Sequence, residues 1–182
     1  SDNSLSSNRI KDITGIENEI WIATDNGLNK YDKSTDKFTV YKKLHDENSV
    51  VNDEIRVLYI DKEGLLWIGT RGGICTFDRK SKFTSYNDVL EKNGIYEKTV
   101  SSIYEDSEGI MWFGLGNDGG LVKYNKETDE IINYLSDNED INSISFNNIR
   151  SIDEDSEGNI WIGTQSGLNK LNKETEKFTV YT

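Results

Sequence analysis

The residues that could perform acid–base catalysis are few in this 182-residue sequence. There is one histidine, His45, and one cysteine, which excludes a histidine relay, a disulfide framework and a cysteine-based zinc site. Carboxylate pairs occur at Glu105-Asp106 and Glu154-Asp155, and a glycosidase needs two such groups flanking its substrate. Both pairs recur at the same place in a repeated turn, which favours a structural role. We therefore expect no catalytic residue and no enzyme activity.

Metal binding is not indicated either. The acidic turns DKEG and DSEG lack the alternating ligand spacing of a calcium loop. The segment GNDGG at 116–120 is closer in composition, but it offers a single carboxylate, Asp118. We expect no metal site and no cofactor.

The overall charge restricts the partners. The chain has 33 acidic and 21 basic residues, a net charge of −12, which disfavours nucleic acid and direct contact with an anionic membrane surface. No apolar run approaches the length of a membrane-spanning helix, and the first residues lack the features of a signal peptide.

The positions of these groups are set by an internal repeat. The four tryptophans, Trp21, Trp67, Trp112 and Trp161, recur at a spacing of roughly 45 to 50 residues, which is typical of propeller blades. Each unit contains four short alternating segments separated by turn residues. The sequence predicts an all-β fold, a β-propeller of four-stranded antiparallel blades, as one domain over 1–182. The predicted blades are 4–48, 49–93, 94–142 and 143–182.

The second unit shows the pattern most clearly. Its predicted strands are 55–60, 65–70, 74–78 and 82–86. Asp61 is expected to bond to the amides that follow it, and Gly64 to adopt positive φ. In the first unit this turn is one residue shorter, and Asn18 replaces the glycine as the residue expected to be left-handed. We expect the tryptophans to pack between blades.

The repeated pattern resembles the two-component regulator propeller repeat over essentially the whole chain. In the fourth unit the resemblance rests on Asp155, Gly158, Trp161, Gly163, Thr164, Gly167 and Leu168. In the second unit it rests on Asp61, Gly64, Trp67, Gly69, Thr70 and Gly73. The first unit departs from the pattern at Ala23 and the third at Leu115.

The resemblance implies a function and a location. Members of that family are extracytoplasmic sensory propellers of bacterial hybrid histidine kinases and related signalling proteins. It implies a non-catalytic module that binds a small polar ligand, often a glycan fragment, and signals through downstream domains of its parent protein. It implies a periplasmic or cell-surface location. Propellers of the family usually have more than four blades.

How four blades close is left open by the sequence. The repeat boundaries indicate complete blades, so no spare strand is expected to close a ring. Two chains forming an eight-bladed ring, one chain forming a four-bladed ring, and an open arc cut from a larger domain all remain open. The near-identity of GLNKYDKSTDKFTVY and GLNKLNKETEKFTVY in the first and fourth units favours a homodimer.

Topology points to one face as the binding site. In an up-and-down blade, the turn between strands two and three lies beside the segment that leads into strand one, and propellers commonly bind ligands on such a face. From the turns we predict Asp25, Asn26, Arg71, Asn117, Asp118 and Gln165 as ligand-binding residues. From the lead-in segments we predict Asn8, Arg9, Lys98 and Asn147, with Asp53, Glu54 and Asn148 beside them.

Two other functions remain open. An acidic propeller surface also suits a scaffold that assembles with basic protein partners. A carbohydrate-active enzyme or lyase is the third reading, although no residue is singled out as a general base. Ligand sensing is the function that we expect.

Overall fold

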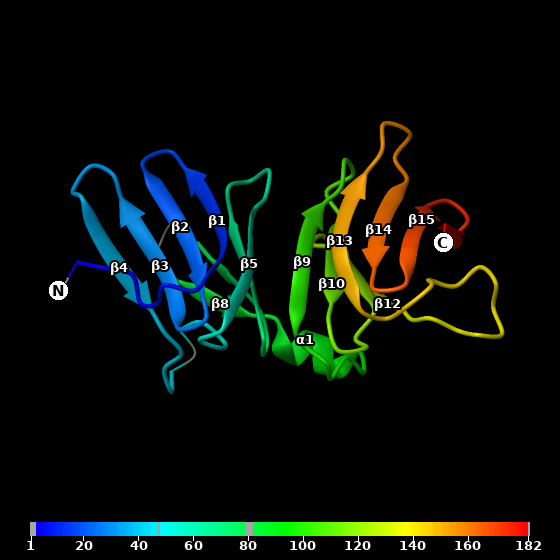
Figure 1. The fold of residues 1–182 in the computed structure, drawn as a ribbon, viewed down its shortest axis with the longest axis horizontal. Helices are drawn as coiled ribbons and strands as arrows, with labels where there is room; N and C mark the ends of the chain where they lie inside the picture. The colour runs from blue at the N-terminus through cyan, green and yellow to red at the C-terminus, as the bar shows by residue number, and fades with distance from the viewer. Residues whose placement is uncertain (1–2, 47, 79–81, 182) are drawn as a thin grey trace. The chain divides into compact units, whose positions relative to one another are not determined.

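The computed structural model describes residues 3–46, 48–78 and 82–181. Within these residues the chain forms four four-stranded sheets, each an antiparallel meander with its strands in chain order (Figure 1). This confirms the predicted all-β fold of four-stranded blades. Ser1 and Thr182, the ends of the predicted domain, lie outside the described residues, and the predicted blade boundaries stay a prediction.

The first two blades form one compact unit, residues 1–89, which we call unit 1. Blade 1 consists of β1 (Ile10–Ile16), β2 (Glu19–Thr24), β3 (Gly27–Asp32) and β4 (Lys37–Tyr41). Blade 2 consists of β5 (Ile55–Ile60), β6 (Leu66–Thr70), β7 (Gly73–Phe77) and β8 (Phe83–Ser85).

The other two blades form a second compact unit, residues 90–182, which we call unit 2. Blade 3 consists of β9 (Val100–Glu105), β10 (Met111–Leu115), β11 (Leu121–Tyr124) and β12 (Ile131–Tyr134). Blade 4 consists of β13 (Ile149–Glu154), β14 (Ile160–Thr164), β15 (Gly167–Asn172) and β16 (Lys177–Tyr181).

Two local features differ from the sequence prediction. A short helix, α1 (Asn87–Lys92), follows β8 and buries Leu90, but it is too brief to produce a helical periodicity. In the first turn of blade 1 the left-handed residue is Glu17, with φ of 54°, and not Asn18 as predicted. Among the described residues no helix has the length and apolar character needed to cross a membrane.

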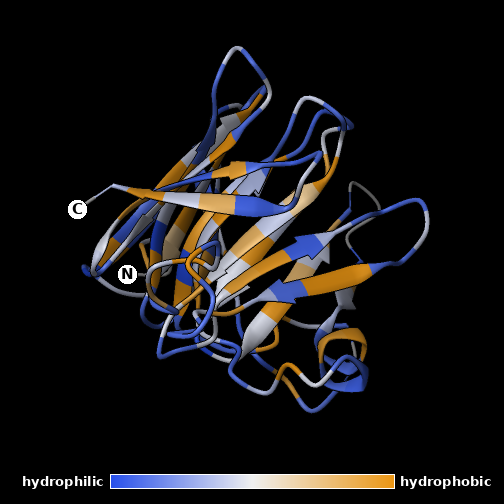
Figure 2. Ribbon diagram, turned by 90° about the vertical axis from the view of Figure 1, so that its right-hand side faces the viewer, coloured by the Kyte–Doolittle hydropathy of each residue, from blue (hydrophilic) through white to orange (hydrophobic). Residues whose placement is uncertain are grey.

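Apolar side chains fill the space between neighbouring blades within each unit. In unit 1 the indole of Trp21 packs on Phe77 of blade 2, with ring centroids 5.1 Å apart. Nearby, the backbone N–H of Leu58 donates to Asp12 Oδ2 at 2.8 Å and ties β5 to β1. Figure 2 shows hydrophobic residues gathered on the strands and hydrophilic residues on most connecting turns. Trp21 therefore has the inter-blade packing role predicted for the tryptophans.

Three of the tryptophans donate their indole N–H to an aspartate six residues earlier in the chain, and we call each such pair an Asp–Trp pair. The distances from Nε1 to Oδ2 are 2.9 Å for Trp67 to Asp61, 3.0 Å for Trp112 to Asp106 and 2.8 Å for Trp161 to Asp155. The other oxygen of each aspartate accepts two backbone N–H groups of its turn, as predicted for Asp61. The hydrogen bond from Trp161 is the main reason why the pKa of Asp155 is well below its usual range.

In unit 2 a lysine of blade 4 binds the Asp–Trp pair of blade 3. Lys173 Nζ lies 3.2 Å from Asp106 Oδ2, 2.9 Å from Glu108 Oε1 and 3.0 Å from Glu154 Oε1. The side chain of Asp106 has no exposed surface, so solvent screens its attraction to Lys173 only weakly. Burial opposes the charge of Lys173, but its carboxylate partners prevail and raise its pKa. The turns of blades 3 and 4 are thereby linked.

Replacing Asp106 by alanine is expected to lower the free energy of unfolding by about 3 kcal/mol, because Trp112 and Lys173 both lose a buried hydrogen-bond acceptor. Urea denaturation followed by circular dichroism measures this loss. Glu174→Ala, at an exposed position of unit 2, is the control and should change stability by no more than about 0.5 kcal/mol. An equal loss in the two variants would contradict the structural role of Asp106.

Candidate functional site

The turns between second and third strands lie at the same end of the blades as the segments leading into the first strands, and we call this end the loop face. Backbone hydrogen bonds tie one blade to the next here. Gly27 N donates to the carbonyl of Asp53 at 2.7 Å in unit 1, and Gly120 N donates to that of Asn147 at 2.8 Å in unit 2. The loop face is therefore continuous across the two blades of each unit.

In blade 1 three of the predicted loop-face residues, Arg9, Asp25 and Asn26, bond to neighbouring protein groups. Arg9 Nη1 lies 3.2 Å from Asp25 Oδ2. The hydroxyl of Ser7, and after it the guanidinium of Arg9, holds the pKa of Asp25 below its usual value. Asn26 Oδ1 accepts a hydrogen bond from Lys42 Nζ at 2.9 Å. A ligand at this turn would have to compete with these contacts.

Blade 2 contributes Arg71, the predicted cation of the loop face. Its Nη1 lies 3.3 Å from Glu54 Oε2, while Glu54 Oε1 lies 3.0 Å from Arg56 Nη1. The side chain of Arg71 is 66% exposed, so its ion pair contributes only about 0 to 1 kcal/mol of stability. The guanidinium is therefore exposed on the loop face, beside the carboxylate of Glu54.

The turn of blade 3 departs from the repeat, as its two extra residues predict. Asn117 and Asp118 are exposed and take left-handed φ values of 48° and 68°. Asn117 Nδ2 donates to Thr99 Oγ1 at 3.1 Å, which ties the turn to its lead-in segment. In the other blades a threonine occupies the position of Leu115 and caps the turn by bonding to a glycine carbonyl. The longer turn thus replaces a threonine cap.

The remaining predicted residues of unit 2 also have protein partners. Lys98 forms an ion pair with Glu91. Gln165 Oε1 accepts a hydrogen bond from Asn148 Nδ2 at 3.2 Å. Asn147 Oδ1 accepts a backbone N–H at 2.6 Å. These bonds shape the loop face and leave part of each side chain open to solvent.

The predicted ligand-binding residues therefore lie on the loop face in two sets, one in each unit. Unit 1 holds Asn8, Arg9, Asp25, Asn26 and Arg71, and unit 2 holds Lys98, Asn117, Asp118, Asn147 and Gln165. Within the described part of the chain, the side chains of Asn8 and Asp118 form no hydrogen bond or ion pair. These two are the most available to a ligand.

The carboxylate pairs considered for catalysis are held in structural contacts. Asp106 and Asp155 accept the indole N–H groups of their own blades. Glu105 Oε1 lies 2.8 Å from Lys126 Nζ, and Glu154 is bonded to Lys173. Their positions in a repeated turn thus reflect how a blade is built.

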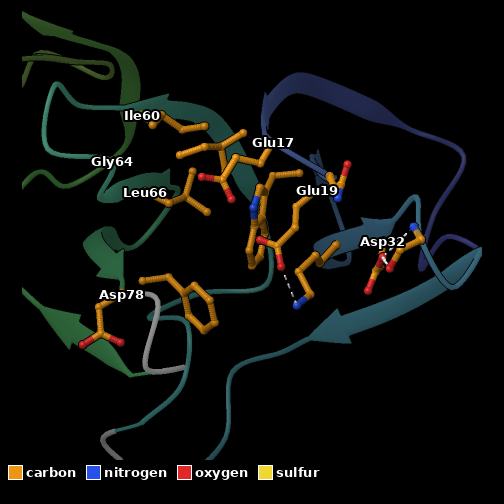
Figure 3. Close-up of a pocket in the computed structure, with 13 residues that line it drawn as sticks. Glu17, Glu19, Asp32, Ile60, Gly64, Leu66 and Asp78 are labelled. Atoms are coloured by element: carbon orange, nitrogen blue, oxygen red, sulfur yellow. Dashed lines mark hydrogen bonds and ion pairs between the residues drawn. The ribbon is translucent and has the colours of Figure 1, made fainter.

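A second candidate site lies at the opposite end of the strands in unit 1. It is a cavity of about 310 Å³ between the first hairpin of blade 1 and the neighbouring strands of blade 2. In Figure 3 the carboxylates of Glu17 and Glu19 point toward its middle, whereas Asp32 and Asp78 lie at its two ends. Blade 2 supplies apolar wall residues such as Leu66. The cavity is thus polar on one side and apolar on the other.

The cavity coincides with a break in the repeat. Thr14 is the strand partner of Trp21, and Ile16 follows it by two residues. In blade 2 the position two residues beyond the partner of the tryptophan belongs to Asp61. Ile16 therefore stands where the other blades have the aspartate of the Asp–Trp pair, and its side chain cannot accept a hydrogen bond.

Trp21, Lys30 and Glu19 are among the polar residues that line the cavity beside this break. Lys30 Nζ lies 3.0 Å from Glu19 Oε1 and 5.8 Å from the centroid of the Trp21 ring. Burial disfavours the charged form of Lys30, but the hydrogen bond to Glu19 and other nearby groups outweigh it, so its pKa is raised. Lys30 is thus held as a cation at the cavity wall.

Sequence reasoning did not find this cavity. Its signal was nevertheless present, because an aspartate precedes the tryptophan by six residues in three units and not in the first. The shorter first turn is visible in the sequence, but the partner that it removes is not, because the indole hydrogen bond depends on side-chain geometry.

Comparison with known proteins supports the repeat assignment. The family described as two component regulator propeller matches residues 49–72, 97–117 and 143–166, which lie in blades 2, 3 and 4. A search of curated protein sequences finds no match.

Solved structures share the fold. The extracellular domain of a hybrid two-component system of B. thetaiotaomicron aligns with a TM-score of 0.83 and 28% identity, covering 98% of this chain and 24% of that one. A second such extracellular domain from the same organism aligns with a TM-score of 0.74 and 28% identity, covering 91% and 22% of the two chains.

A more distant likeness shows the fold alone. Virginiamycin B lyase from Staphylococcus aureus aligns with a TM-score of 0.69 at 16% identity, covering 96% of this chain and 55% of that one. This chain spans about a quarter of the length of the two-component structures that it matches. Its four-stranded sheets and these likenesses identify the chain as a β-propeller, and its segments in blades 2, 3 and 4 match repeats of the two-component regulator propeller family.

Proposed function

We propose that this chain is a non-catalytic, ligand-sensing propeller module of a bacterial membrane signalling protein. The observation that carries the proposal is the 28% identity, over 98% of the chain, to the extracellular domain of a hybrid two-component system. The matches to two-component regulator propeller repeats support it. By this proposal the module is extracytoplasmic, in the periplasm or at the cell surface, and the output domains belong to the rest of the parent protein.

The ligand of this module, on the same proposal, is a glycan fragment or another small polar molecule bound on the loop face. Sugar hydroxyls both donate and accept hydrogen bonds, so they suit a surface that mixes amides with groups of both charges. Among the described residues the side chains of Asn8 and Asp118 have no hydrogen-bond or ion-pair partner, and Arg71 adds an exposed guanidinium that is paired with Glu54. The acidic chain favours neutral or basic ligands over anionic ones.

Soluble oligosaccharides are expected to raise the melting temperature of the chain, because a ligand that binds only the folded state at 100 times its Kd adds about 2.7 kcal/mol of stability. Thermal-shift screening of an oligosaccharide panel measures this. Asn8→Ala and Asp118→Ala should each be tested, since they lie in different units, and at least one should reduce the shift. Glu174→Ala, at the other end of blade 4, is the control. No shift across the panel, or one that both variants keep, contradicts a glycan site on the loop face.

The proposed partner is a second copy of the chain, completing a propeller ring. Within unit 1, the Phe77–Phe83 pair of blade 2 covers Trp21 of blade 1. Tyr31 and Phe38 of blade 1 form the corresponding strand-paired aromatics, with ring centroids 4.9 Å apart. This face of blade 1 has the chemistry of a surface that covers a tryptophan.

Blade 4 carries the complementary surface. Trp161 stacks on Tyr181 at 5.5 Å, as Trp21 stacks on Tyr41 at 5.8 Å in blade 1. Tyr181 is 47% exposed, and Leu168 beside it is 42% exposed. Blade 4 of one copy and blade 1 of another therefore match in the way that neighbouring blades do, which supports head-to-tail pairing.

Light scattering is expected to give the mass of two chains at high protein concentration, because pairing would bury these aromatic faces. Tyr181→Asp places a charge in the proposed contact and should shift the mass toward one chain. Glu139→Asp, a conservative change at an exposed position, is the control and should leave the mass unchanged. A single-chain mass at all concentrations contradicts the homodimer.

A further inference from the structure

The cavity in unit 1 contains a buried hydrogen-bond donor that the protein does not satisfy. Trp21 is 2% exposed and lines the cavity. Within residues 3–46, 48–78 and 82–181, Trp21 Nε1 donates no hydrogen bond, and the protein does not enclose this nitrogen completely. The indole N–H is therefore reachable from the cavity and has no acceptor of its own.

Blade 4 shows which group accepts the indole N–H when the Asp–Trp pair is present. There Lys170 Nζ lies 5.7 Å from the centroid of the Trp161 ring, and Asp155 Oδ2 lies 3.6 Å from the same ammonium and 2.8 Å from the indole nitrogen. In blade 1 the ring and the ammonium keep the same relation, at 5.8 Å for Lys30 and Trp21. What blade 1 lacks is the acceptor oxygen, because Ile16 stands in its place.

The groups around the missing oxygen restrict what can replace it. Among the described residues, the cavity wall holds the four carboxylates of Glu17, Glu19, Asp32 and Asp78 and one ammonium, that of Lys30, which Glu19 already binds. These carboxylates would repel an anionic ligand. A bare ammonium group could meet the carboxylates but could not accept the indole N–H. A hydroxyl can accept from Trp21 and donate to a carboxylate in the same pose.

We propose that this cavity binds a small polyol without negative charge, one of whose hydroxyl oxygens accepts the hydrogen bond of Trp21 Nε1 in place of the absent aspartate. The remaining hydroxyls bond to Glu17, Glu19 and Lys30, and the carbon skeleton rests on the apolar wall near Leu66. The volume of about 310 Å³ is at the lower end of the range of small-molecule pockets. The site is separate from the loop face and does not depend on the function proposed for that face.

The indole N–H resonances of the chain provide a direct test. The chain has four tryptophans, so a ¹H–¹⁵N spectrum shows four indole signals. The signal that disappears in Trp21→Phe is that of the Trp21 indole N–H. Sorbitol, glucosamine and gluconate serve as probes, because they are similar in size and carry no charge, a positive charge and a negative charge. Sorbitol and glucosamine should shift the Trp21 signal saturably and leave the other three in place, and gluconate should not.

Substitutions at Ile16 separate the site from general effects. Ile16→Asp supplies the missing carboxylate, so sorbitol binding, followed at the backbone amide of Glu19, should weaken by about tenfold or more, equivalent to about 1.4 kcal/mol. Ile16→Val keeps an apolar side chain there and should bind as the unmodified chain does. Thr35→Asp adds the same charge at an exposed position of blade 1 that does not line the cavity, and should also leave binding intact.

Trp21→Phe keeps an aromatic ring but removes the donor, and it should weaken sorbitol binding to the same extent as Ile16→Asp. Its circular dichroism spectrum and melting temperature report whether the blade still folds. The proposal is overturned if sorbitol and glucosamine leave the Trp21 resonance unmoved, if gluconate binds as well as sorbitol, or if a folded Trp21→Phe chain binds sorbitol unchanged. Loss of loop-face binding in Asn8→Ala or Asp118→Ala should not alter these results.

Discussion

The need to give a buried indole N–H an acceptor governs how a blade of this chain is built. A tryptophan on the second strand packs against the next blade, which removes its polar edge from water. An aspartate at the preceding turn accepts that N–H with one oxygen and the turn amides with the other. One carboxylate therefore fixes the turn, the strand register and the ring position together. Where Ile16 breaks this arrangement, the hairpin shortens and a cavity lies beside the ring.

Most of the fold was predictable because it depends on local patterns that repeat. Alternating strands, turn glycines such as Gly64 and the Asx turn at Asp61 are encoded within a few residues. The strand pattern recurs in four units, and the turn glycine and aspartate recur in three. Helix α1 was not predicted, because its six residues are too few to show the hydrophobic periodicity of a helix. The residue preference of asparagine predicts positive φ at Asn18, but Glu17 adopts it, because the length of the loop decides which residue of a hairpin is left-handed.

The candidate sites were predictable to different degrees. Topology alone places turns and lead-in segments at one end of a blade, so residues such as Arg71 and Gln165 could be assigned to the loop face from sequence. Their bonding could not, since the Gln165–Asn148 and Arg71–Glu54 contacts depend on side-chain geometry. The cavity beside Trp21 required knowing a hydrogen bond between side chains six residues apart, which no propensity encodes. In a repeat protein, a position where one copy lacks a residue that the other copies share is therefore a place to look for a site.

The side-chain contacts of Asp106 with Trp112 and with Lys173 have different consequences for how such a chain can be recombined. Its bond to Trp112 lies within blade 3 and would travel with that blade if the repeat were duplicated or moved. Its bond to Lys173 comes from blade 4 and would be lost unless the neighbour moved too. A gene rearrangement that duplicates or moves one blade therefore keeps its Asp–Trp pair. Blade 3 keeps the contact with Lys173 only if blade 4 moves with it. Separating the two blades would remove Lys173 from the buried carboxylate of Asp106.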